Sequence, residues 1–143
     1  MLIILISAII LFLDQLSKFL ISNTLDFGES IPILKDIFHL TLIQNSGAAF
    51  GIFHQQTLFF IIVACVVIGL ILISHRKFIG RSLLLRVGLA LILGGALGNL
   101  VDRLRFGFVV DFLDFRIWPV FNIADTSICV GMGLFILGFV KGR

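Results

Sequence analysis

Two aspartates, Asp111 and Asp125, carry the strongest chemical signal in the sequence. Asp111 stands in the apolar stretch Val109–Leu113, and Asp125 closes the stretch Phe121–Asp125. Two close carboxylates tend to share one proton, because both cannot ionise cheaply. Such a pair supplies a base that activates water and an acid that protonates a leaving group. The residues therefore predict acid–base hydrolysis at a carboxylate pair.

Each aspartate taken alone has a simpler interpretation. Asn122 is a candidate N-cap, which would put Asp125 in the first turn of a helix, where the helix dipole favours an anion. Asp111 alone would be the partner of a nearby arginine, and the candidates are Arg103, Arg105 and Arg116. Only the two aspartates taken together indicate a catalytic site.

Other hydrolytic chemistries find little support in the sequence. The three histidines, His39, His54 and His75, are scattered, and neither an HExxH nor a GxSxG motif is present. No phosphate-binding glycine loop occurs either. Cys65 and Cys129 each stand inside an apolar run and are interpreted as small buried hydrophobes.

The composition shows what kind of structure must position these residues. Of the 143 residues, 59% are hydrophobic and 13% are charged, and the mean hydropathy is +1.19. A soluble core of this size could not hide so much apolar surface, so the excess must face lipid. The net charge of +3 comes mostly from residues that border apolar runs, which indicates membrane orientation and argues against nucleic-acid binding. The length favours one domain over residues 1–143.

Four apolar segments are long enough to cross a bilayer as helices, because about 20 residues span roughly 30 Å. They are Leu2–Ile21, Thr57–Ser74, Leu83–Val101 and Phe121–Val140. The first lacks a basic leader and a clear cleavage site, so we expect it to remain as a helix and not to be a removed signal. The predicted fold is an all-α membrane protein with four transmembrane helices.

The connections between the predicted helices add a small β-containing region. Residues Asp36–Ile43 alternate in polarity, as strands do, which places an extracytoplasmic β region between the first and second helices. Phe108–Asp114 could also be extended. Lysines and arginines favour one side by six to four, which predicts that both termini are cytoplasmic. The six are Arg76, Lys77, Arg81, Arg86, Lys141 and Arg143, and the four are Lys35, Arg103, Arg105 and Arg116.

Charged residues inside spans are costly and are candidates for function. Asp14 and Lys18 are spaced as an i,i+4 ion pair, which either braces the first helix or supports a site. Gly94 and Gly98 have the GxxxG spacing of close helix packing. Arg103, near the outer end of the third helix, could snorkel to the interface or hold a carboxylate.

Four stretches together resemble the motif boxes of the lipoprotein signal peptidases, also called signal peptidase II. They are Asp14–Lys18, Asn45–Phe50, Gly94–Arg103, and the pair Val109–Phe112 and Phe121–Asp125. They occur in the order of that family and cover nearly the whole chain. The resemblance implies an aspartic endopeptidase of the bacterial cytoplasmic membrane, which cleaves prolipoproteins just before a cysteine that carries a diacylglyceryl group.

The resemblance also assigns roles to residues. It implies that Asp111 and Asp125 form the catalytic dyad. Supporting or substrate-binding roles fall to Asp14, Lys18, Asn45, Gly95, Asn99, Arg103, Asn122 and Ala124. The implied partners are lipid-modified prolipoproteins and membrane lipid, with no nucleic acid, no metal and no cofactor. We expect a monomer whose active site lies near the outer membrane face.

Two alternatives from other classes remain open at this point. A small transporter or proton-conducting protein would use Asp14, Lys18, Asn99 and Asp125 as a polar pathway. However, the polar residues gather at the outer ends of the spans. A membrane adaptor would use the glycine-rich third helix only to bind a partner, and it does not explain the two carboxylates.

Overall fold

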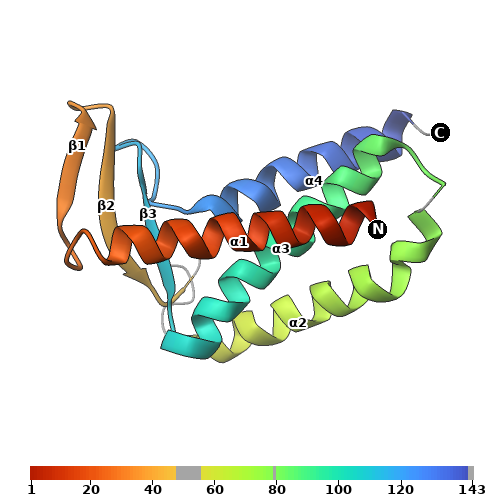
Figure 1. Cartoon of the computed structure of the whole chain (residues 1–143), viewed down its shortest axis with the longest axis horizontal. Coiled ribbons are helices and arrows are strands. Elements are labelled where there is room, and N and C mark those ends of the chain that lie inside the picture. Colours follow the sequence, from red (N-terminus) through yellow and green to blue (C-terminus); the bar gives the residue numbers. More distant parts are fainter. Residues whose placement is uncertain (48–55, 79, 142–143) are drawn as a thin grey trace.

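Four long helices form a bundle, and a small sheet crosses one end of it (Figure 1). The computed structural model describes residues 1–47, 56–78 and 80–141. In this part of the chain the long helices are α1 (Leu2–Ser22), α2 (Thr57–Ser74), α3 (Leu83–Phe106) and α4 (Ile123–Lys141), and a short 3₁₀ helix, η2 (His75–Phe78), continues α2. All four long helices are long and apolar enough to cross a membrane, which confirms the predicted fold class.

The sheet draws strands from two connections. Its antiparallel strands, in the order β1-β2-β3, are β1 (Ser30–Leu34), β2 (Phe38–Asn45) and β3 (Val109–Asp114). The β region is therefore not confined to the connection between α1 and α2, because β3 comes from the connection between α3 and α4. The predicted strand 36–43 lies two residues later, since Asp36 adopts a φ of 59° in the turn before β2.

Two helix ends differ from the predicted spans by more than one residue, because hydrogen bonds set them. α3 continues past Val101 to Phe106 and stops at Gly107, whose φ of 80° and N–H bond to Arg103 close the helix. α4 begins at Ile123 because Phe121 pairs with Leu113 in an isolated β-bridge. Hydropathy locates a membrane crossing, but backbone pairing decides where each helix ends.

α3 is the central helix of the bundle. About half of its spanning window is buried (56%), against 22% or less for the other three helices. The predicted GxxxG pair packs against α1, since a Cβ added to Gly94 would lie 2.8 Å from the carbonyl oxygen of Ser7. Small residues thus let neighbouring helices approach α3 closely.

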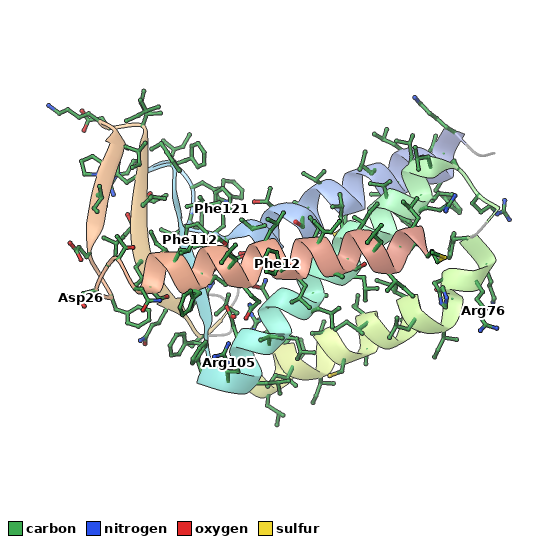
Figure 2. All side chains as sticks on the ribbon, in the orientation of Figure 1. Phe12, Asp26, Arg76, Arg105, Phe112 and Phe121 are labelled. Atoms are coloured by element: carbon green, nitrogen blue, oxygen red, sulfur yellow. The ribbon has the colours of Figure 1, made fainter. Side chains whose placement is uncertain are left out.

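The outer surface of the bundle is apolar, as a lipid environment requires. Phe12, near the middle of α1 in Figure 2, is 63% exposed. Cys65 and Cys129 are exposed as well, so their interpretation as buried hydrophobes was wrong. An apolar run in lipid does not distinguish an inward from an outward face, because both faces are apolar.

The two ends of the bundle differ in character. The start of α1, the end of α4 and Arg76 lie at one end (Figures 1 and 2). Phe121 and Phe112, which belongs to β3, lie at the other end (Figure 2). Arg76, Lys77 and Lys141, which are among the basic residues that predict the cytoplasmic side, therefore lie at the end opposite the sheet. The orientation itself stays a prediction.

Candidate active site

Asp111 lies on β3 and is completely buried. Both of its carboxylate oxygens accept hydrogen bonds from amide side chains. Asn45 Nδ2 donates to Oδ2 at 2.8 Å, and Asn122 Nδ2 donates to Oδ1 at 2.7 Å. None of the three arginines considered from the sequence holds it. Arg116 instead pairs with Asp114 at 3.0 Å.

Asp125 lies in the first turn of α4, as predicted. The N–H of Asp125 donates to Asn122 Oδ1 at 2.8 Å, and the N–H of Asn122 donates back to Asp125 Oδ2 at 3.3 Å. This reciprocal arrangement has the geometry of a capping box, which confirms Asn122 as the cap. Asn99 Nδ2 donates to the other oxygen, Oδ1, at 2.7 Å.

Two asparagines connect the aspartates. Asn122 donates to Asp111 and caps Asp125, and its Nδ2 also lies 3.1 Å from Asn99 Oδ1. The carboxamides fix the orientation of both carboxylates without adding a charge. The two predicted carboxylates thus belong to one hydrogen-bonded unit.

The electrostatics of this unit favour one shared proton. Burial, and next the charge of Asp125, raise the pKa of Asp111 from its ordinary value to about 7. The hydrogen bonds from Asn45 and Asn122 and the charge of Lys18 oppose this rise. At near-neutral pH, Asp111 is therefore a carboxyl group able to hold and to release a proton.

A buried ion cluster lies next to the two asparagines. Lys18 Nζ contacts Asp14 Oδ2 at 2.9 Å and Asp102 Oδ2 at 2.8 Å, and it donates to Asn99 Oδ1 at 3.1 Å. Asp14 also accepts the N–H of Ala124 at 2.9 Å. The predicted i,i+4 pair is confirmed and is linked to the aspartates through Asn99.

Asp102 and Gln15 also belong to this network, although no role could be assigned to either residue from the sequence. Asp102 Oδ2 accepts the N–H of Val110 at 3.1 Å, and Gln15 Nε2 donates to Asp102 Oδ1 at 2.9 Å. Asp102 therefore ties α3 to the residue before Asp111. A signal was present, since Asp102 lies three residues after Asn99 and so on the same helix face.

Arg103 and Gly95 lie beside the polar network. Arg103 Nη2 donates to the carbonyl oxygen of Gly47 at 3.3 Å, and its guanidinium lies 4.9 Å from the ring centre of Phe60. A Cβ on Gly95 would overlap the carbonyl oxygen of Ala124, so Gly95 allows close packing of α3 on α4. Of the motif stretch Asn45–Phe50, residues 48–50 lie outside the described part of the chain.

An open cleft reaches the site from one side. It has a volume of about 790 Å³, within the range of ligand-binding clefts. Most of the residues that line it are apolar, and a few are polar or charged; among them are Phe60, Trp118, Asn45, Asn99, Arg103 and Asp125. Asp125 thus faces the cleft directly. Asp111 is buried behind Asn45, which lines the cleft and donates a hydrogen bond to Asp111. Among the described residues, no group of three potential ligands is placed to hold a metal ion.

Comparisons with known proteins agree with one another. The sequence profile described as signal peptidase (SPase) II matches residues 6–141. A lipoprotein signal peptidase from Halothermothrix orenii is 53% identical over 129 residues, which cover 90% of this chain and 88% of that protein. One from Moorella thermoacetica is 51% identical over 128 residues, with 90% and 85% covered. A solved structure of a bacterial membrane enzyme matches with a TM-score of 0.88 and 34% identity, covering 97% of this chain and 87% of that one.

Proposed function

The chain belongs to the signal peptidase II family, and on this premise we propose that it removes signal peptides from prolipoproteins. We propose further that it cuts just before the diacylglyceryl-modified cysteine, with Asp111 and Asp125 as the catalytic pair. One observation carries this proposal: Asn99 and Asn122 join the two carboxylates beside a cleft that is lined mostly by apolar residues. Because the chain belongs to this family, we reject the alternatives of a transporter and of a membrane adaptor.

The two aspartates have different surroundings, which suit different roles. Asp125 faces the cleft, so in this proposal its carboxylate takes a proton from a water molecule, which attacks the carbonyl carbon of the scissile bond. The protonated Asp111 then gives its proton to the departing amine nitrogen. A raised pKa suits this acid, because a proton held near pH 7 can still be released.

The substrate would meet the site at the membrane surface. The apolar walls of the cleft suit the acyl chains of the modified cysteine, which then need not leave the bilayer. Asn45 and Arg103, which line the cleft, are placed to bind the peptide backbone or a nearby charge. We propose that the termini are cytoplasmic and that the site lies at the outer face of the bacterial inner membrane. We propose also that the protein acts as a monomer.

Cleavage by the purified protein in detergent tests this function. The substrate is a prolipoprotein peptide with a diacylglyceryl group on its cysteine, and the product mass locates the cut bond. We expect cleavage on the N-terminal side of that cysteine. The same peptide without the lipid is the control and should remain intact. A folded wild-type protein that cuts neither peptide, or cuts both equally, would contradict the proposal.

The pKa of Asp111 predicts how activity depends on pH. Above about pH 7 the dyad loses its shared proton, so kcat/KM should fall as the pH rises through this value. The hydrogen bond from Asn45 lowers the pKa of Asp111, so Asn45→Ala should raise this pKa and move the alkaline limb to higher pH. A pH series of initial rates for both proteins measures the shift.

Thr41→Val is the matched control for this prediction. Thr41 lies on the same strand as Asn45, but it donates to Asp114 at 2.7 Å and not to Asp111. The alkaline limb of kcat/KM for the Thr41→Val variant should therefore stay at the wild-type pH. If the alkaline limb moves to lower pH in Asn45→Ala, or moves equally in both variants, it does not report the loss of a proton from Asp111.

A further inference from the structure

An interaction between two helices orients the first turn of α4. Asp14 belongs to α1, yet its Oδ1 accepts the N–H of Ala124, the second residue of α4, at 2.9 Å. The first amides of a helix have no partner within the helix. Asp14 therefore caps α4 from another helix, one residue before Asp125.

Gly98 leaves the space that this contact needs. A Cβ added to Gly98 would lie 2.5 Å from Asp14 Oδ2 and 3.3 Å from the Cβ of Ala124. Gly98 thus lies where the carboxylate of α1 meets the start of α4. From the sequence, the only role predicted for Gly98 was helix packing, as one half of a GxxxG motif.

Asp14 has little freedom to give way to a methyl group. It is completely buried, and both of its oxygens are engaged. Lys18 Nζ lies 2.9 Å from Oδ2, Gln15 Nε2 donates to Oδ2 at 3.2 Å, and the N–H of Ala124 donates to Oδ1. Any rotation that cleared the methyl group would weaken at least one of these contacts, and each weakened contact would leave a buried polar group unpaired.

We infer that Gly98 is a positioning residue for Asp125: the absence of its side chain lets Asp14 cap the first turn of α4. The inference rests on the proposed function, because it assigns Asp125 to catalysis. Gly98 touches neither substrate nor water in this role. It acts through Asp14 and Ala124 on the orientation of the carboxylate that faces the cleft.

Gly98→Ala should therefore lower kcat more than it raises KM. A methyl group there displaces Asp14 or the first turn of α4, and a displacement of about 1 Å at a catalytic group costs roughly 100-fold in rate. The cleft walls stay in place, so KM should change little. Initial rates are normalised to folded protein, as judged by thermal unfolding in detergent.

Gly94→Ala is the matched control, one helical turn away on the same helix. A Cβ there would meet Ile10 Cβ at 2.7 Å and the carbonyl oxygen of Ser7 at 2.8 Å, so it strains the α1–α3 contact without touching the cap. It should lower stability but leave kcat per folded molecule near wild type. Equal kcat losses in the two variants would overturn the positioning role.

A double-mutant cycle with Asp14→Ala tests the route of the effect. If Gly98 acts through Asp14, Gly98→Ala should cause no further loss of kcat in that background. Full additivity would overturn the inference. Should Asp14→Ala have no turnover left, amide exchange decides: the first turn of α4 should exchange faster in Gly98→Ala than in Gly94→Ala, and equal exchange would contradict the cap.

These outcomes separate the inference from the function on which it rests. If the wild type cleaves the lipidated peptide and Gly98→Ala behaves like Gly94→Ala, the positioning role fails and the peptidase remains. If the folded wild type does not cleave, the proposed function fails, and the exchange result still reports whether the cap exists.

Discussion

Asp125→Asn and Asp111→Asn should each lower kcat by about 10⁴-fold or more, a loss typical of removing one member of a catalytic unit. An amide can neither take a proton from water nor give one to an amine at neutral pH, so both proton transfers stop. The substitution keeps the size of the side chain. Cleavage of the lipidated peptide, per folded molecule, measures the loss.

Asp114→Asn provides the control on the same strand as Asp111. Asp114 pairs with Arg116 and accepts a hydrogen bond from Thr41, away from the two asparagines that join the dyad. Its kcat should stay close to wild type. Wild-type turnover in either dyad variant would remove that aspartate from the mechanism, and an equal loss in Asp114→Asn would mean that activity reports sheet integrity instead of chemistry.

Lys18→Met should cause the largest loss of stability in the bundle, roughly 3–5 kcal/mol, since it leaves buried carboxylates without their cation. Lys18 is 4% exposed and contacts both Asp14 and Asp102, which are buried as well. Methionine keeps most of the chain length, so the charge is the main change. Unfolding by denaturant in detergent measures the difference.

Lys77→Met is the matched control, because Lys77 lies exposed in η2 at the opposite end of the bundle. It should change stability by less than about 1 kcal/mol. The double variant Lys18→Met with Asp102→Asn removes one of the stranded charges and should recover part of the loss. If Lys18→Met and Lys77→Met are equally stable, the buried cluster does not stabilise the fold.

The buried polar network explains how hydrolytic residues persist in an apolar bundle. Lys18 neutralises charge beside Asn99, and Asn99 in turn orients Asp125. Each buried polar group in this chain of contacts has a partner, which avoids the cost of unpaired groups in a medium of low polarity. Stability and the geometry of the site are therefore coupled, and this is why the variants above must be compared per folded molecule.

Features that depend on residues close together in the chain could be predicted from the sequence alone. Lipid leaves no partner for open backbone groups, so four long apolar runs had to be helices. The Asn122–Asp125 cap and the Asp14–Lys18 pair join residues three and four positions apart, and helical geometry alone brings such residues together. The motif boxes indicated the family. The resemblance to that family then indicated site residues, several of which belong to one hydrogen-bonded network in the structure.

Contacts between groups far apart in the chain depend on the packing of the helices and the sheet. The bond from Asn45 to Asp111, the tie from Asp102 to Val110 and the cap from Asp14 to Ala124 depend on how α1, α3, α4 and the sheet pack. Periodicity and hydropathy describe one segment at a time, so they could not reveal these contacts or the exposure of Cys65. The catalytic geometry proposed here arises because small residues on α3 let charged groups from three helices converge on one buried point.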